Sequence, residues 1–160
     1  ADIYTRPDHL ALDIFRVSNH RSEPLPRERD RRNFEESLRQ MLQGPGDRPG
    51  ILTAPKPSYR RDETPREEQD LPVRVFIDNA SHPTCTLLEI QAPDRMGLLY
   101  HLLRAISHGG ISIETARIAT EQKAALDVFY IRGRDGNKIT AKPALLRLER
   151  RLRTAAARTE

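Results

Sequence analysis

The sequence predicts an α+β fold of the β-α-β-β-α-β type, present as one complete copy preceded by the rear half of another copy. Three observations support this prediction: an internal repeat, an ordered series of strand and helix patterns in the second half of the chain, and a linker-like composition between the copies. The chain has 160 residues, of which 37% are hydrophobic. This composition suits a modest core rather than a large one.

The internal repeat has an offset of 114 residues, because residues 11–15 (ALDIF) reappear as residues 125–129 (ALDVF). At the same offset Val17 matches Ile131, Leu25 matches Ile139, Phe34 matches Leu148 and Leu38 matches Leu152. Upstream, after a shift of one residue, Ala1, Ile3 and Thr5 match Ala116, Ile118 and Thr120. Since identities and apolar positions agree in both directions, two copies of one unit explain the pattern better than chance.

The composition between the copies predicts the domain boundaries. Residues 43–71 contain five prolines, three glycines and mixed charges, which cannot pack a core. We therefore predict the C-terminal half of a first repeat over residues 1–42, a linker over 43–71 and a complete domain over 72–156. Half a sheet cannot bury its own face. We expect that the chain is a fragment of a longer protein, or that its open half is completed by another chain or by the second copy.

The complete copy opens with two strands and a helix. Residues 73–78 alternate in hydrophobicity and predict a short lead-in strand, and residues 84–92 (TCTLLEIQA) predict a buried strand. A Pro-Asp pair at 93–94 breaks this strand, and a Gly-Gly pair at 109–110 ends the helix that follows. The helix presents one apolar stripe. That stripe consists of Leu98, Leu99, Leu102, Leu103 and Ile106.

Two strands, a turn and a second helix complete the copy. Residues 111–120 and 124–132 predict two strands joined as a hairpin. The turn residues 134–137 (RDGN) precede a short strand expected around Ile139. The final helix carries its apolar stripe on Leu145, Leu148 and Leu152, with Pro143 in its first turn. This order of elements predicts the ferredoxin-like α+β arrangement.

The turn between the buried strand and the first helix is the predicted binding segment. Unpaired backbone N–H groups and the helix dipole favour a carboxylate at this place. Asp94 is positioned to cap the helix, and Gly97 lacks the Cβ that would keep a ligand away from the backbone. This geometry suits a free amino acid, although an ordinary capped strand–helix turn explains the same residues. The segment consists of Asp94, Arg95, Met96, Gly97, Leu98 and Leu99.

The stretch APDRMGLLYHLLRAISHGGISIETARIAT, followed by ALDVFYI and a turn, resembles an ACT domain, a small regulatory module of the ferredoxin-like fold. It is most similar to the paired ACT domains that end the bifunctional protein-PII uridylyltransferase/uridylyl-removing enzymes, in which glutamine is the sensed signal. The resemblance covers residues 72–155 and, through residues 1–5 and 12–17, the rear of a preceding ACT domain. One departure is Met96, which stands where that family usually has proline.

The resemblance implies a regulatory role and a set of partners. The effector, an amino acid and specifically glutamine, would lie between the segment 94–99 and the early second strand of a neighbouring ACT domain, in cis or in a homo-oligomer. That part of the second strand consists of Ile111, Ser112 and Ile113. Binding would shift the arrangement of the paired domains and so bias the catalytic domains of a parent nucleotidyltransferase chain. An assembly module or free-standing regulator that binds no ligand is the alternative.

Asp13 and Asp127 occupy the same place in the two copies, each inside an otherwise apolar strand. Apolar residues on both faces of this strand imply packing by helices on one side and by a partner domain on the other. Asp127 could hold a ligand amine or an arginine of another domain. A solvated aspartate at the rim of the sheet is the other interpretation.

This segment shows no catalytic or metal-binding pattern. It has no Gly-Ser followed by an Asp-x-Asp pair for nucleotidyl transfer and no His-Asp dipeptide for metal-dependent hydrolysis, so we expect any uridylyl chemistry upstream of Ala1. We expect no cofactor and no metal, because neither His82 with Cys85 nor His101 with His108 has partners at ligand spacing. With Cys85 as its single cysteine the chain can form no internal disulfide.

The charge pattern argues against nucleic acid and membrane partners. The 27 Lys and Arg are interspersed with 23 Asp and Glu, Trp is absent and only eight residues are aromatic. RNA-recognition modules share the ferredoxin-like fold but need stacking aromatics on the third strand, where residues 124–129 supply small residues and an acid. The arginines of the last helix form a basic surface, for which a solvated helix face is the usual explanation. We expect a cytoplasmic protein without a membrane segment.

Overall fold

The computed structural model describes residues 1–6, 8, 10–17, 24, 27–43, 71–95, 97–121 and 124–157 of the chain. The chain divides into two units, which are described separately below. One unit combines Ala1–Phe15 with Glu67–Glu160, and the other is Arg16–Arg66. No helix among the described residues is long and apolar enough to cross a membrane.

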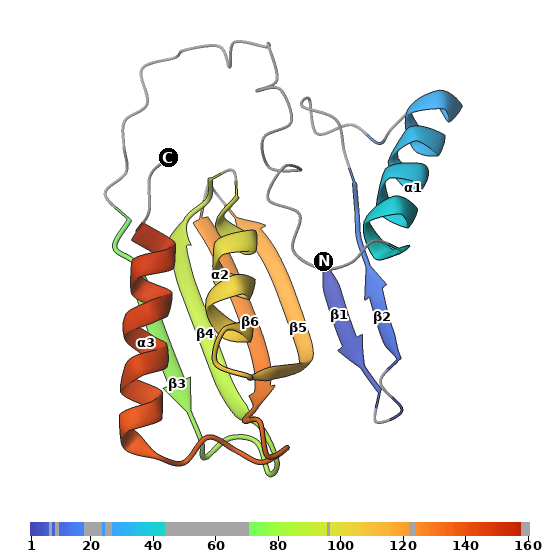
Figure 1. Cartoon of the computed structure of the whole chain (residues 1–160). Coiled ribbons are helices and arrows are strands. Elements are labelled where there is room, and N and C mark those ends of the chain that lie inside the picture. The colour runs from blue at the N-terminus through green and yellow to red at the C-terminus, as the bar shows by residue number, and fades with distance from the viewer. Residues whose placement is uncertain are drawn as a thin grey trace. The chain divides into compact units, whose positions relative to one another are not determined.

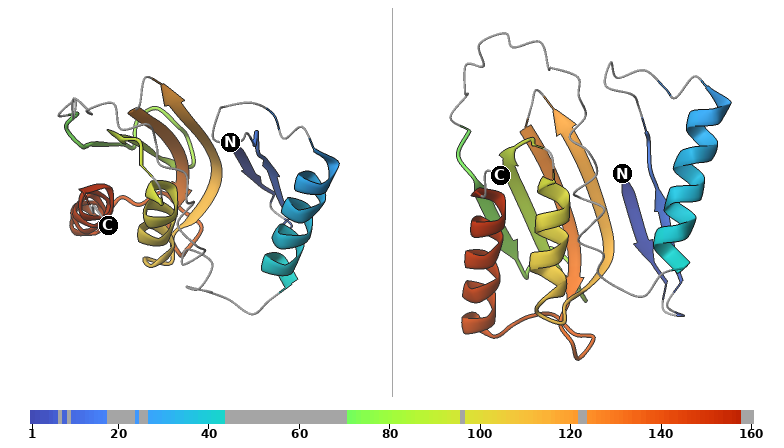
Figure 2. Two further views of the ribbon diagram at one scale, coloured as in Figure 1. Left: turned by 90° about the horizontal axis from the view of Figure 1, so that it is seen from above. Right: turned by 45° about the horizontal axis from the view of Figure 1, so that its top comes forward.

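The first unit is built on an antiparallel sheet of six strands in the order β2-β1-β5-β6-β4-β3. The strands are β1 (Asp2–Thr5), β2 (Ala11–Ile14), β3 (Arg74–Asp78), β4 (Thr86–Pro93), β5 (Ser112–Glu121) and β6 (Ala124–Arg132). Helices α2 (Leu98–Ser107) and α3 (Lys142–Ala157) cover one face of the sheet formed by β3 to β6 (Figures 1 and 2).

The core lies between these two helices and the sheet. Every second residue of β4 and β6 is buried, which follows from the alternation of side chains along a strand. The helix α2 buries one stripe at a spacing of four residues. The core residues are Val75, Leu88, Ile90, Ala92, Leu98, Leu102, Ile106, Ala116, Ala125, Phe129, Ile131, Ile139, Leu148, Leu152, Ala155 and Ala156. The four longer strands, the two helices and the apolar stripe predicted for the second copy are therefore confirmed.

The ferredoxin-like fold class is confirmed, with one change in the chain order of its elements. The four strands β5, β6, β4 and β3 lie side by side, all antiparallel, with both helices on one face. In a β-α-β-β-α-β chain the edge strand beside the first strand follows the second helix. Here the lead-in strand β3 pairs with β4 at that edge, so the domain runs β-β-α-β-β-α.

The predicted short strand around Ile139 is wrong, because side chains rather than a neighbouring strand satisfy the backbone there. The Ile139 N–H donates to Thr86 Oγ1 at 3.0 Å, and the Ile139 carbonyl accepts from Asn79 Nδ2 at 3.0 Å. Thr86 Oγ1 in turn donates to Asn79 Oδ1 at 2.7 Å. Thr86 and Ile139 are both buried, so these hydrogen bonds satisfy polar groups that water cannot reach.

The first repeat has the same elements as the second half of the complete domain. Its helix α1 (Glu28–Gln43), in the second unit, has 16 residues and begins 114 residues before α3, which also has 16 residues. Its strands β1 and β2 lie at the repeat positions of β5 and β6. Of the linker predicted over residues 43–71, residues 44–70 lie outside the described residues, so the domain boundaries stay a prediction.

The two repeats pair through equivalent strands. The strand β1 lies antiparallel to β5, with Asp2 opposite Arg117, Ile3 opposite Ala116 and Tyr4 opposite Thr115. Asp2 and Arg117 are themselves equivalent positions of the repeat. A strand that pairs with its own counterpart through equivalent residues creates a local two-fold relation between the two strands.

Candidate functional site

The turn between β4 and α2 places a left-handed glycine at the start of the helix. Gly97 has a φ of 78° and is the N-cap residue of α2. The Leu98 N–H donates to the Arg95 carbonyl at 3.2 Å, and the Gly97 carbonyl accepts from the His101 N–H at 3.0 Å. A positive φ of this size disfavours any residue with a Cβ. Met96 lies outside the described residues.

The expectation that Asp94 caps α2 is wrong. Gly97 occupies the N-cap position, and no side chain makes a capping hydrogen bond there. Asp94 lies three residues earlier and is exposed, so its carboxylate falls outside the positions from which an N-cap side chain reaches the first turn. The N-terminus of α2 therefore has no carboxylate of its own chain as a cap, which keeps it suited to an external anion.

Arg95 ties the turn to the far end of α3. Its Nη2 donates to the carbonyl of Ala155 at 2.8 Å and to the carbonyl of Ala156 at 3.1 Å. These are carbonyls of the last helical turn, which carry the negative end of the helix dipole. Arg95 thus fixes the position of the turn, and its guanidinium is already engaged. Sequence analysis could not find this contact, because the partners are 60 residues away.

The remaining predicted site residues fall into two groups. One group begins α2, and the other lies beyond the C-terminal end of α2. Leu98 is buried in the core and Leu99 is half-buried against it. Ile111 and Ile113 are half-buried and Ser112 is exposed, just after the C-terminal end of α2. Because a ten-residue helix separates the two groups by about 15 Å, the turn and this strand segment meet only if two domains contribute them. The combined site stays a prediction.

Asp127 is buried in the sheet, so its interpretation as a solvated rim residue is wrong. It is 2% exposed and lies on the same face of β6 as the core residues Ala125 and Phe129. Its Oδ1 has no hydrogen-bond partner among the described residues. Burial raises the pKa of Asp127 to about 6, a backbone hydrogen bond from Ala119 lowers this pKa in part, and the charge of Asp94 raises it. Its counterpart Asp13 is exposed.

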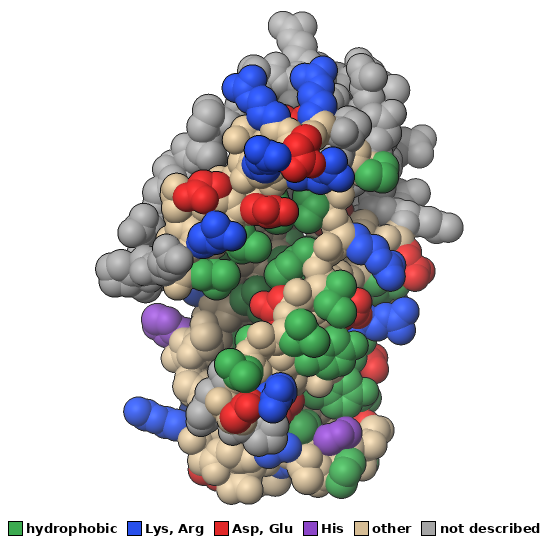
Figure 3. Space-filling model, turned by 90° about the vertical axis from the view of Figure 1, so that its right-hand side faces the viewer, with side chains coloured by type: hydrophobic (Ala, Val, Ile, Leu, Met, Phe, Trp, Pro, Cys, Tyr) green, Lys and Arg blue, Asp and Glu red, His purple; other side chains and the backbone are tan. Residues whose placement is uncertain are grey.

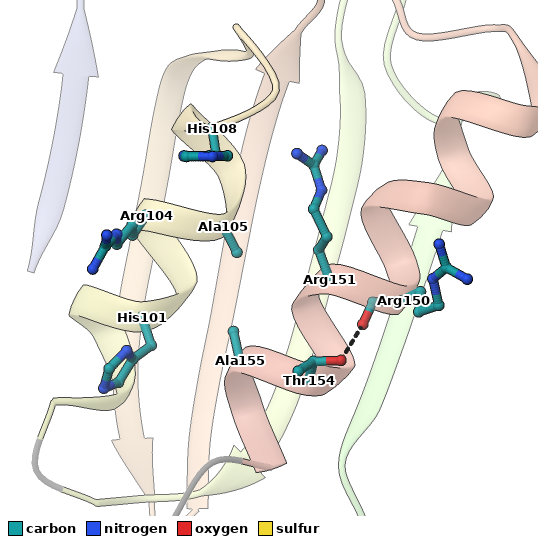
Figure 4. Close-up of a pocket in the computed structure, with 8 residues that line it drawn as sticks. All are labelled: His101, Arg104, Ala105, His108, Arg150, Arg151, Thr154 and Ala155. Atoms are coloured by element: carbon teal, nitrogen blue, oxygen red, sulfur yellow. Dashed lines mark hydrogen bonds between the residues drawn. The ribbon is translucent and has the colours of Figure 1, made fainter. Parts of the chain in front are cut away.

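A basic groove lies on the helix side of the domain, between α2 and α3 (Figure 4). It has a volume of ≈ 430 Å³. Arg150 and Arg151 of α3 line it together with Arg104 and two histidines of α2. Sequence analysis identified the arginines of α3 only as a charged helix face, because the approach of α2 to that face depends on tertiary packing.

Comparison with known proteins identifies the family of the domain. Residues 74–159 match the family model described as "ACR9-like, ACT-like domain". The chain belongs to the ACT-like domain family. The match begins at the first residue of β3, in agreement with the place of β3 as the first strand of the domain. The resemblance seen in the sequence is confirmed.

The most similar proteins with a curated name include three bacterial bifunctional uridylyltransferase/uridylyl-removing enzymes. The enzyme of Rhodospirillum rubrum is 31% identical over 159 residues, which are 99% of this chain and 17% of the relative. That of Azospirillum brasilense is 40% identical over 87 residues, which are 54% of this chain and 9% of the relative. That of Gluconobacter oxydans is 33% identical over 153 residues, which are 95% of this chain and 16% of the relative.

The chain thus spans less than a fifth of the length of these curated relatives. It is an ACT-like regulatory domain similar to one segment of such enzymes. No solved structure matches the chain.

Proposed function

We propose that this chain is the amino-acid-sensing module of a bifunctional uridylyltransferase/uridylyl-removing enzyme, and that glutamine is the amino acid it senses. The similarity to such enzymes over nearly the whole chain supports the parent activity. The observation that carries the sensing role is the turn between β4 and α2. Gly97 begins α2 there without a side-chain cap, so the helix N-terminus is suited to receive the α-carboxylate of an amino acid.

The buried carboxylate of Asp127 supplies the complementary charge for an α-ammonium group. A buried polar atom without a partner costs roughly 1–3 kcal/mol, more when it is charged. The unpartnered Oδ1 of Asp127 would regain this free energy on accepting hydrogen bonds from an ammonium. A free amino acid carries the two charges that the helix N-terminus and Asp127 require, which favours it over a simple anion.

Binding would control the parent enzyme through the pairing of the two repeats. The strands β1 and β5 already pair through equivalent residues, and the predicted effector position lies where the turn of one ACT domain approaches the second strand of another. An effector that binds one arrangement of the paired domains better than the other shifts the population toward it. The catalytic domains of the parent chain would respond to that shift.

An assembly module that binds no ligand is the second candidate. The observation in its favour is the six-stranded sheet itself, in which strands of the two repeats pair edge to edge. In that function the α2 N-terminus would be hydrated and Asp127 would serve no ligand.

Calorimetric titration with glutamine and the other amino acids separates the two candidates. Sensing predicts heat with glutamine for the unchanged chain and its loss in Gly97→Ala. A Cβ at Gly97 would meet only His101 atoms at 3.7 Å, an ordinary contact, so the substitution strains the positive φ of this residue without causing a clash. Gly136→Ala is the matched control, because Gly136 also has a positive φ of 75° but lies in an open turn. Absence of heat for every amino acid would leave assembly as the function.

A further inference from the structure

The helix layer of the complete domain is strongly basic. The only acidic residue in α2 and α3 is Glu149, and Arg153 Nη2 engages it at 2.9 Å. The other arginines near the two helices form no ion pair within the described part of the chain. These arginines are Arg104, Arg134, Arg147, Arg150 and Arg151.

The unpaired arginines surround two adjoining hollows. The groove between α2 and α3 has a volume of ≈ 430 Å³, and the neighbouring hollow beside Gly109 and Ile139 has ≈ 390 Å³. The two hollows share Arg150 and Arg151. Together they are lined by five arginines and two histidines, and by no aspartate or glutamate. Hollows of this size suit a small molecule rather than a protein surface.

Arg151 lies between the two hollows and has an unsatisfied donor. Its Nε is buried and has no hydrogen-bond partner among the described residues. Its guanidinium lies so close to the end of α2 that a Cβ on Gly109 would be 2.7 Å from Nη2. Figure 4 shows the Arg151 side chain between the two helices, above the facing methyl groups of Ala105 and Ala155. Arg151 as a whole is half-buried, and no hydrogen bond of its guanidinium group is found among the described residues, so its terminal N–H groups can donate to acceptor atoms of a ligand.

The first repeat shows that the helix does not need these arginines in order to fold. At the repeat offset the counterparts of Arg147, Arg150 and Arg151 in α1 are Asn33, Glu36 and Ser37. In α1 the charges of Arg31 and Arg32 are instead compensated by ion pairs with Glu28 of the same helix, at 2.8 and 3.1 Å. Both helices keep the apolar stripe, so the stripe belongs to the fold and the arginines belong to the second repeat alone.

The chemistry of the hollows favours a ligand with several phosphate oxygens. Guanidinium groups match phosphate oxygens in bidentate geometry. A single carboxylate would leave most of the five arginine charges uncompensated, whereas a diphosphate or triphosphate carries several negative charges. No Phe, Tyr or Trp lines either hollow, which disfavours single-stranded nucleic acid, since it binds largely by stacking on rings.

We propose that the groove between α2 and α3 binds a small anion with a diphosphate or triphosphate group, held by Arg151, whose side chain extends between the two helices, while Arg104 and Arg150 point outward and add positive charge at the edges of the groove (Figure 4). This site goes beyond the proposed amino-acid sensing. The groove contains none of the predicted effector residues, and the adjoining hollow contains only Ile111, so the two functions can fail independently.

Calorimetric titration of the chain with pyrophosphate, and with a nucleoside triphosphate and its unphosphorylated nucleoside, tests this site. We expect pyrophosphate and the triphosphate to bind and the nucleoside to give no heat. Arg151→Ser, which introduces the residue found at this position in α1, should weaken binding by about tenfold or more. Arg153→Ser removes one charge from the same helix but from the residue paired with Glu149, and should change the affinity less than about twofold.

Three outcomes would overturn the proposal. These are no binding of pyrophosphate at millimolar concentration, equal weakening by Arg151→Ser and Arg153→Ser, and binding of citrate as tight as that of pyrophosphate. Thermal unfolding of each variant checks that it is folded. If Arg151→Ser does not fold, Arg151→Lys replaces it, because lysine keeps the charge but loses the bidentate geometry of the guanidinium group and should still weaken binding. Glutamine binding should be unchanged in all these variants, so its failure would concern only the sensing function.

Discussion

The two repeats share one sequence pattern but bury it to very different extents. Phe129 is fully buried, whereas its counterpart Phe15 in the first repeat is 48% exposed. Leu148 of α3 is likewise fully buried, whereas its counterpart Phe34 of α1 is 41% exposed. The pattern of apolar residues therefore suffices to specify strand and helix, while burial depends on which other elements are present to cover them.

The covering elements are β4 and α2, which supply six of the 16 described core residues of the complete domain. No counterpart of these two elements exists among the described residues of the first repeat. Hydrophobic side chains consequently gather on the surface on the side of the molecule seen in Figure 3. Those of β2 and the segment after it are Leu12, Ile14, Phe15 and Val17.

The largest expected effect comes from truncating equivalent phenylalanines. Phe129→Ala should lower the free energy of unfolding by about 3–5 kcal/mol, because it removes a fully buried ring from a packed core. Phe15→Ala should lower it by less than about 1 kcal/mol. Urea unfolding followed by circular dichroism measures both. Equal losses would mean that the first repeat is as well packed as the complete domain.

The equivalent aspartates should differ in their effect on pH dependence. Since the folded pKa of Asp127 is about 6 and its ordinary value is 3.8, the folded domain favours the protonated form. Stability is then fully present below about pH 4 and falls as the pH rises through 6. Asp127→Asn should raise the free energy of unfolding by up to about 3 kcal/mol at pH 7.5 and leave it unchanged near pH 4. Asp13→Asn should leave the free energy of unfolding unchanged at both pH values. A pH-independent effect of Asp127→Asn would refute this account.

The hydrogen bonds that replace the predicted strand around Ile139 should have a smaller effect. Thr86→Val keeps the shape of the side chain but leaves the Ile139 N–H and Asn79 Oδ1 without their partner. We expect a loss of about 1–3 kcal/mol in the free energy of unfolding. Thr120→Val, on the exposed surface of β5, is the control and should change stability by less than about 0.5 kcal/mol.

The contact between Arg95 and the end of α3 should have the smallest effect. Arg95→Ala removes two hydrogen bonds to the carbonyls of Ala155 and Ala156, and we expect a loss of about 1 kcal/mol in the free energy of unfolding. Arg74→Ala on the exposed part of β3 should have no measurable effect. Thermal unfolding of both variants provides the comparison, and equal shifts in melting temperature would show that Arg95 does not stabilise the helix end.

The sequence allowed the elements to be predicted where the cause is local. Leu98, Leu102 and Ile106 have helical spacing, and all three are buried. It did not allow predictions that depend on distant partners. Ile139 has the apolar surroundings of a strand, but the side chains of Asn79 and Thr86 take the place of a neighbouring strand.

The candidate site shows the same division between local and distant causes. Gly97 could be singled out from its place before an apolar stripe. The N-cap position is taken by Gly97 in the left-handed conformation rather than by Asp94, and the burial of Asp127 depends on neighbouring elements of the domain. The groove around Arg151 depends on how α2 packs against α3, which no periodicity in the sequence records.

The most direct test of the proposed sensing role is hydrogen–deuterium exchange of the chain with and without glutamine. Amide exchange reports the local stability of each element. If glutamine binds at the junction of two ACT domains, protection should increase in residues 94–99 and 111–113 and should leave residues 74–78 of β3 unchanged. No change at either segment at saturating glutamine, or an increase confined to other elements, would contradict this account.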